Sequence, residues 1–325
     1  MNKKDRVRAA LRGEAVDHVP VSMWGHDFLR EWSAEDLAAQ TLESYRSSDW
    51  DFIKLNPRWT FFAEAWGNTY ERPTEQRFPR LKTRVVQATA DLRAIQPVDP
   101  AAGAFGEQLE ALRLVLAGAP EAFVVYTLFS PLAVLGLLCG GVGEPLTSFA
   151  REDPAAVQTT LRNITETLTR HGEAALQAGA AGVFFAPLQW SSRRNSTEEF
   201  YREFGRPYDL QTLDALRGAE FNILHVCGDD NLIRLLLDYP VSALNWADHG
   251  PGNPTLAEVR ELTSLAVIGG IDQSSIHRID AAEAAAEAAN VLATAPSKFM
   301  LAAGCGISPL TSNEVKAAVV QAARG

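Results

Sequence analysis

The sequence has 325 residues, of which 46% belong to the hydrophobic set and 22% are charged. This composition excludes a disordered or fibrous chain and fits one large globular domain or two small ones. Its 30 basic and 40 acidic side chains leave a formal net charge of −10, which argues against nucleic acid as a partner.

The chain also lacks the signals of secretion and of membrane insertion. Three cysteines, Cys139, Cys227 and Cys305, are an odd number in a long chain, which argues against a disulfide framework and for a reducing compartment. The charged start has no apolar run behind it, as a secretory signal would require. No segment reaches the ~18 apolar residues of a membrane span. We therefore expect a cytoplasmic protein that is soluble throughout.

Helical and β-rich patterns alternate along the chain. Helical spacing of apolar residues predicts a helix over Asn2–Leu11, and a strand over Val19–Met23 follows it. The next β-rich runs are Phe52–Leu55, Phe123–Tyr126, Gly182–Phe185, Ile223–Val226, Ala243–Trp246, Ala266–Gly269 and Phe299–Ala302. Amphipathic stretches that predict helices lie between them, among others at Ala155–Ala178, Asn231–Leu237, Leu256–Leu262 and Ala281–Ala293.

This alternation predicts parallel strands joined by helical crossovers. About eight such strands indicate an α/β fold of the (β/α)8 TIM barrel type. We expect residues 1–325 to form one such domain, with a helical extension at its N-terminus. A doubly wound open sheet is the competing architecture, but its glycine-rich turn after the first strand is missing. The cluster Gly140–Gly143 lies between two helical patterns and is interpreted as a loop.

The strongest local signal for chemistry is the run His225-Val226-Cys227 at the end of a predicted strand. Residues two apart on a strand point the same way, so the imidazole and the thiol should face one cavity. Cys305 also follows a predicted strand. In a barrel all three side chains would emerge at the C-terminal mouth, where such folds place their active sites.

One imidazole and two thiolates form a soft ligand set that suits zinc. Three protein ligands leave a fourth position open, as in catalytic zinc sites. A structural site would more typically show paired Cys-x-x-Cys motifs, which are absent. The alternative is that the cysteines are buried small hydrophobic residues, which is the usual role of free cysteines.

Several segments carry a family resemblance that spans nearly the whole chain. They are Arg6–Val21, Trp50–Leu55, Gly269–Asp272 and Gly304–Ile307, the last followed by a helix start at Asn313-Glu314. Together they resemble the uroporphyrinogen decarboxylase superfamily. The resemblance implies a (β/α)8 barrel, in agreement with the strand count.

That superfamily contains decarboxylases and corrinoid-dependent methyltransferases, which differ at identifiable residues. The decarboxylases have an arginine-rich segment after the first strand and a Gly-His-Gly-Ile turn near the C-terminus. Here the first segment reads Met23–Phe28, without arginine, and Cys305 stands where the histidine would be. The methyltransferase branch carries a His-x-Cys…Cys zinc set, and His225, Cys227 and Cys305 match it residue by residue.

The resemblance therefore implies a zinc-dependent methyltransferase that moves a methyl group to a small-molecule thiol. Methylcobalamin on a separate corrinoid protein would be the donor, and because the decarboxylases of the family are dimers, a homodimer is a further expectation. Zinc would make the acceptor more reactive, since the thiolate and not the thiol is the nucleophile. Two alternatives stay open, a uroporphyrinogen decarboxylase-type lyase of tetrapyrrole biosynthesis and a non-catalytic barrel that binds a small molecule or a corrinoid partner.

Other candidate site residues are polar or aromatic groups near predicted strand ends. Asp248 and Asp272 are candidates to assist catalysis, by orienting His225 or by holding a substrate, although helix capping would explain them equally well. We assign substrate binding to His26, Lys54 and Trp190. Packing in the core or a solvated surface position is the alternative for each of these three.

Overall fold

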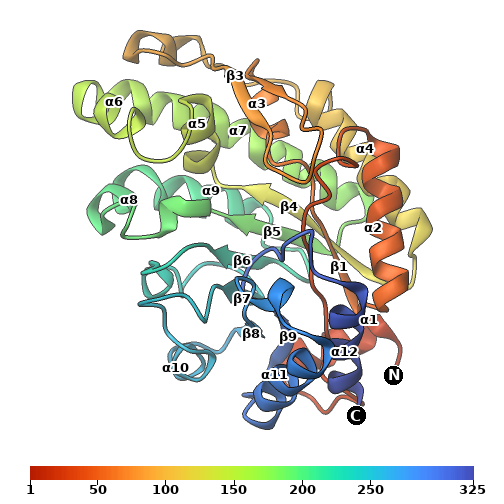
Figure 1. The fold of residues 1–325 in the computed structure, drawn as a ribbon. Helices are drawn as coiled ribbons and strands as arrows, with labels where there is room; N and C mark the ends of the chain where they lie inside the picture. The colour runs from red at the N-terminus through yellow and green to blue at the C-terminus, as the bar shows by residue number, and fades with distance from the viewer.

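The computed structural model describes residues 1–325 and is built around a curled parallel sheet with helices on its outside (Figure 1). The sheet has seven strands in the order β1-β4-β5-β6-β7-β8-β9, and all neighbours are parallel. The strands span β1 Phe52–Leu55, β4 Phe123–Phe129, β5 Gly182–Ala186, β6 Ile223–Val226, β7 Ala243–Trp246, β8 Ala266–Ile271 and β9 Phe299–Ala303. The predicted α/β barrel fold is confirmed.

Twelve α-helices accompany the sheet. They are α1 Lys3–Arg12, α2 Ala34–Ser48, α3 Phe61–Glu64, α4 Gly103–Gly118, α5 Pro131–Leu138, α6 Leu146–Glu152, α7 Pro154–Ala178, α8 Glu198–Phe204, α9 Arg206–Ala215, α10 Leu256–Leu262, α11 Ala281–Ala293 and α12 Asn313–Arg324. Short 3-10 helices are η1 Thr89–Ala94, η2 Leu188–Ser191, η3 Ile233–Leu235 and η4 Ile276–Arg278. Both chain ends lie on the same side of the molecule, beside α1 and α12 (Figure 1).

Local sequence signals explain where the long helices begin and end. The Asn2 side chain accepts a hydrogen bond from the backbone N–H of Asp5 at the start of α1, and Gly13 ends that helix in the left-handed region with φ 75°. Asp153 caps α7 in the same way, and Gly179 ends it with φ 115°. These ends define the lengths of the crossovers and therefore where the next strand begins.

An irregular segment takes the eighth position of the barrel, between β9 and β1. The predicted strand Val19–Met23 is extended, but it forms only a parallel bridge between Val21 and Leu301 of β9. On its other side Asp51 donates its backbone N–H to the carbonyl of Val21 and accepts the N–H of Val21 on its carboxylate at 2.8 Å. A buried carboxylate thus replaces part of the strand ladder, while Arg6 neutralises its charge at 2.6 Å.

The strands of the sheet are buried along their whole length. One connected hydrophobic core joins them to the helices. This pattern explains why the strands are continuous apolar runs without polar alternation, since both faces of a parallel sheet are covered. A separate antiparallel hairpin, β2 Thr69–Glu71 and β3 Arg80–Thr83, lies outside the sheet.

Two local predictions had different outcomes. The segment predicted as a helix over Asn231–Leu237 contains only the 3-10 turn η3, so this prediction is wrong. The physical reason is that its backbone bonds to other loops: Leu232 N–H donates to the Ser191 carbonyl, and Asn231 N–H donates to the Asn253 side chain. By contrast, the predicted Gly140–Gly143 loop is confirmed as a stretch of turns.

None of the helices combines the length and the apolar character needed to cross a membrane.

Candidate metal centre

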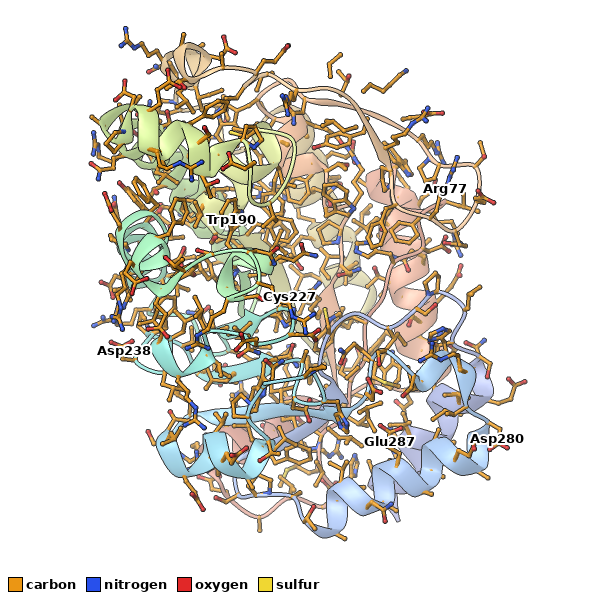
Figure 2. All side chains as sticks on the ribbon, turned by 60° about the vertical axis from the view of Figure 1, so that its left-hand side comes forward. Arg77, Trp190, Cys227, Asp238, Asp280 and Glu287 are labelled. Atoms are coloured by element: carbon orange, nitrogen blue, oxygen red, sulfur yellow. The ribbon has the colours of Figure 1, made fainter.

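Three side chains that the sequence analysis selected as metal ligands meet at the carboxyl ends of the strands. His225 lies in β6, Cys227 directly follows that strand, and Cys305 follows β9. Their ligand atoms all lie within 4.8 Å of one another, and no other group of this kind is found in the chain. Figure 2 shows Cys227 near the centre of the view, while Arg77, Asp238 and Asp280 lie toward the edge of the molecule.

The histidine of this group has a defined proton position. His225 Nδ1 lies 2.6 Å from Oδ1 of Asn245 in β7. The Asn245 Nδ2 donates to the carbonyls of Ile268 and Ala303 at 3.0 and 3.1 Å, so its oxygen must face the imidazole. An amide oxygen only accepts, and His225 therefore carries its proton on Nδ1. The other nitrogen, Nε2, lies 3.5 Å from the Cys305 sulfur.

The two thiols behave as a coupled pair. A hydrogen bond from Cys227 to Cys305 raises the pKa of Cys227, and burial raises it further. The same hydrogen bond lowers the pKa of Cys305, with a further contribution from His225. Of the two sulfurs, that of Cys305 is therefore the one whose thiolate is favoured, and the thiolate is the form in which sulfur binds metals. In contrast, burial raises the pKa of Cys139 to about 12, which makes that thiol unreactive.

Lys54 of β1 brings a buried cation to the same end of the barrel. Its Nζ donates to the side-chain oxygen of Asn56 and lies 4.7 Å from the centre of the Phe184 ring. That ring stacks on the His225 imidazole at 5.0 Å, which places the ammonium close to the ligand group. Burial lowers the pKa of Lys54 to about 7, although the charges of Cys305 and Glu31 oppose this shift.

His26 and Glu31 form a pair in the segment before α2. His26 Nδ1 lies 2.8 Å from Oε2 of Glu31, and the imidazole stacks on Phe28 at 4.9 Å. The Glu31 side chain is completely buried, and its second oxygen, Oε1, has no hydrogen-bond partner. The sequence analysis selected His26 but missed Glu31, which stands in an irregular stretch without any periodic pattern.

The two predicted carboxylates lie apart from His225. Asp248 accepts a hydrogen bond from the Gly270 N–H at 3.4 Å and lies 3.6 Å from His249, and burial raises its pKa. Asp272 accepts hydrogen bonds from two serines of the following turn, Ser274 and Ser275. Neither carboxylate orients His225, because Asn245 does so. A substrate-holding role for Asp248 and Asp272 stays a prediction.

Trp190 occupies a packing position in η2. It is fully buried and stacks on Phe200 of α8, with 5.7 Å between the ring centres. Its indole also lies against Gly136 of α5, where any added Cβ would come within 2.6 Å of Nε1. These surroundings are those of a packing residue, and the substrate contact expected from the sequence stays a prediction. Figure 2 shows it among the side chains between the helices.

A cavity of about 630 Å³ lies beside the end of the barrel that carries Cys305. Its walls come from the segment around His26, from the polar face of α2 and from the loop after Cys305, which contributes Ile307 and Ser308. Ile307 and Ser308 follow Cys305 by two and three residues, whereas none of His225, Cys227 and Cys305 lines the cavity.

The comparison with family models decides the family of the chain. The model described as uroporphyrinogen decarboxylase (URO-D) matches residues 2–325. The chain belongs to the uroporphyrinogen decarboxylase family. The resemblance drawn from the sequence segments is thereby confirmed.

Solved structures share the fold of this family member at low sequence identity. A methyltransferase from Methanosarcina mazei superposes with a TM-score of 0.81 at 21% identity, covering 99% of this chain and 98% of that one. A B12-independent methionine synthase from Shewanella sp. W3-18-1, in complex with selenomethionine, gives 0.62 at 13% identity, covering 94% and 97%. A putative vitamin-B12 independent methionine synthase from Listeria monocytogenes gives 0.58 at 14%, covering 94% and 95%. No curated protein matches the sequence.

Proposed function

We propose that this chain is a zinc-dependent methyltransferase that moves a methyl group from a methylated corrinoid, carried by a separate protein, to the sulfur of a small thiol. The observation that carries the proposal is the convergence of His225, Cys227 and Cys305, whose ligand atoms all lie within 4.8 Å of one another, with His225 Nε2 3.5 Å from the Cys305 sulfur. The methyltransferase among the solved structures of this fold supports the reaction class.

The donor set fits zinc and leaves it one open position. Two sulfurs and one imidazole nitrogen are soft ligands, and tetrahedral zinc takes four. When bound, zinc supplies the Lewis acidity that deprotonates a thiol in the remaining position. The three residues lie at the ends of two strands of one sheet, His225 and Cys227 at β6 and Cys305 after β9, so the ligand positions are preorganised.

The protein's own residues prepare the site for this chemistry. Asn245 keeps the proton on Nδ1 of His225, and the hydrogen bond from Cys227 lowers the pKa of Cys305 and so favours its thiolate. Phe184 covers one face of the imidazole and limits the access of water. In the proposed reaction the new sulfur–carbon bond forms as the cobalt–carbon bond of the donor breaks. The electron pair of the broken bond stays on the corrinoid, and the thiol proton leaves to solvent.

The ion pairs of Arg30 and Arg58 weigh against the decarboxylase alternative. That reaction type needs free cations to hold the carboxylates of its substrate. Arg30 forms an ion pair with Glu43 at 2.6 Å, and the buried Arg58 pairs with Glu64 at 2.8 Å and with Glu107. Both guanidinium groups are therefore already neutralised by the protein.

The first test is the zinc content of protein purified without added metal. We expect about one zinc per chain in the wild type and a loss of zinc in Cys305→Ser, because two ligands hold zinc poorly. The matched control is Cys139→Ser, which removes a buried thiol outside the ligand group and should keep the zinc. Absence of zinc from the wild type, even after incubation with zinc salts, would overturn the proposal.

The second test is methyl transfer itself. Zinc-loaded protein is incubated with methylcobalamin and a panel of thiols, and the demethylation of the corrinoid is followed by its absorbance. We expect methyl thioether to accumulate with at least one thiol and to disappear in Cys305→Ser. Consumption of uroporphyrinogen by a metal-free preparation, unchanged in Cys305→Ser, would instead favour the decarboxylase.

The corrinoid partner and a homodimer are further parts of the proposal. A pull-down experiment tests the corrinoid partner, and light scattering tests the homodimer.

A further inference from the structure

The side chain of Lys54 is a buried basic group that forms no ion pair. Its side chain lies at the end of β1, and Asn56 provides its single hydrogen-bond acceptor. No carboxylate forms an ion pair with Lys54. An ammonium group has three N–H donors, and only one of them has a hydrogen-bond partner here. Burying a charge in this way is costly unless a ligand completes its coordination.

Glu31 is a buried acidic group, and one oxygen of its carboxylate has no hydrogen-bond donor. One oxygen accepts from His26, and the other is buried without any partner. The protein therefore places one incomplete cation and one incomplete anion in the same region. Buried polar groups are normally satisfied, and each exception calls for an explanation.

A chain of contacts links both groups to the metal centre. Asn56, which accepts from Lys54, donates to the carbonyl of Gly25 at 2.9 Å. Gly25 is bridged to Ile307, two residues after Cys305, and is followed directly by His26, the partner of Glu31. The charges of Glu31 and Cys305 both raise the pKa of Lys54, so both groups lie within electrostatic reach of its ammonium.

We propose that Lys54 and Glu31 recognise the two charges of a zwitterionic amino-acid thiol, with the carboxylate of the acceptor on Lys54 and its ammonium group on Glu31. This inference rests on the proposed function, because it assumes that the thiol of the same molecule binds at the His225, Cys227 and Cys305 centre. It specifies the acceptor as an amino acid with a thiol side chain, in contrast to a thiol with a single charge.

The physical argument is that a buried charged group is costly unless the bound thiol supplies its partner. A thiol that carries only an anionic group would satisfy Lys54 and leave the free oxygen of Glu31 unpaired. A neutral thiol would leave both charges unpaired. Since a site built to hydrogen-bond a substrate group strongly rejects analogues that lack it, the discrimination should be large.

The experiment measures thiol binding directly, without turnover. Cobalt(II) is loaded in place of zinc, and thiolate binding is followed by the sulfur-to-metal charge-transfer absorption. The probes are L-homocysteine, 3-mercaptopropionate, cysteamine, 2-mercaptoethanesulfonate and 2-mercaptoethanol. We expect L-homocysteine to bind at least about tenfold more tightly than each of the other four.

Substitutions assign the two charges. Lys54→Met should abolish the advantage of L-homocysteine over cysteamine, and Glu31→Gln, which can keep a bond to His26, should abolish its advantage over 3-mercaptopropionate. The matched control is Lys3→Met, since Lys3 is a partly buried lysine that donates to the Trp50 carbonyl just before β1, at the opposite end of that strand. It should leave all five affinities unchanged. Circular dichroism melts establish that each variant is folded.

The outcomes separate the inference from the proposed function. Equal binding of all five thiols, or equal binding of 2-mercaptoethanesulfonate and L-homocysteine, would overturn the zwitterion assignment while the thiol site stands. No spectral change with any thiol would overturn both. Loss of all thiol binding in Lys54→Met and in Glu31→Gln, rather than loss of the preference alone, would also contradict the assignment.

Discussion

Asn245 determines which nitrogen of His225 faces the two cysteines. The amide is anchored by the carbonyls of Ile268 in β8 and Ala303 in β9, so its oxygen can only point at the imidazole of β6. One side chain of β7 thereby connects three other strands, β6, β8 and β9, at the candidate metal centre. Partners of this kind fix the tautomer of a metal-binding histidine and raise its basicity.

Replacing Asn245 by alanine should weaken zinc binding. The variant loses the acceptor for Nδ1, so the imidazole can rotate or change tautomer, and we expect about a 10–100-fold weaker zinc affinity. Competition with a chelator of known affinity measures the change. Asn222→Ala is the matched control, because Asn222 is also a buried amide that bonds two backbone groups, Val183 N–H and the Leu216 carbonyl. Equal loss of zinc affinity in both variants would mean that Asn245 acts only through stability.

Truncation of Trp190 should affect stability and leave thiol affinity unchanged. The indole is fully buried against Phe200 and Gly136, and removing a buried tryptophan leaves a cavity that costs about 3–5 kcal/mol. Urea unfolding of Trp190→Ala measures this loss, while Trp190→Phe should lose less. Thiol titration of the cobalt-loaded variants then checks the function. A selective loss of thiol affinity in Trp190→Phe would restore the substrate role expected from the sequence.

The sequence predicted the barrel well because a parallel sheet is encoded by short-range patterns. Strands buried on both faces appear as apolar runs, and helix ends carry capping residues and glycines. The position of His225, Cys227 and Cys305 at strand ends follows from the same patterns, since parallel strands end at one edge. These features need no knowledge of distant contacts.

The remaining features depend on tertiary contacts that no local pattern contains. Asn245 is an amide within an otherwise apolar strand, and this is the one sequence feature that could have indicated its contact with His225. Glu31 lies in an irregular segment whose path is set by contacts with distant residues. The expected helix over Asn231–Leu237 failed for a related reason, because contacts with Ser191 and Asn253, which lie far along the chain, fix the backbone where that helix would begin.

The buried carboxyl of Asp209 should make stability depend on pH. Burial raises the pKa of Asp209 to about 7, while hydrogen bonds from Tyr201 and Tyr239 oppose this shift. The folded state therefore binds a proton that the unfolded state releases above its ordinary pKa of 3.8. The contribution to stability is full below that value and is lost as the pH rises through about 7.

We expect Asp209→Asn to remove this slope. The free energy of unfolding of the wild type should fall relative to the variant between pH 4 and pH 8, by roughly a few kcal/mol, as judged from urea unfolding at each pH. The buried His171, whose pKa is lowered to about 4 by burial, has an opposite slope that is present in both proteins and cancels in the difference. Parallel stability curves for wild type and variant would contradict the assignment.

The two glycines that flank Cys305 should respond oppositely to alanine. A Cβ at Gly304 would lie 2.7 Å from the Trp246 carbonyl oxygen and 2.9 Å from the Ala247 Cα, both of which belong to the backbone and cannot move aside easily. At Gly306 the nearest atom would be 3.8 Å away, an ordinary van der Waals contact. Gly304→Ala should therefore displace the turn that carries Cys305 and weaken zinc binding by at least about tenfold, whereas Gly306→Ala should retain it. Chelator competition on both variants measures the contrast, and the same affinity in both would show that the position of Cys305 does not depend on the close approach at Gly304.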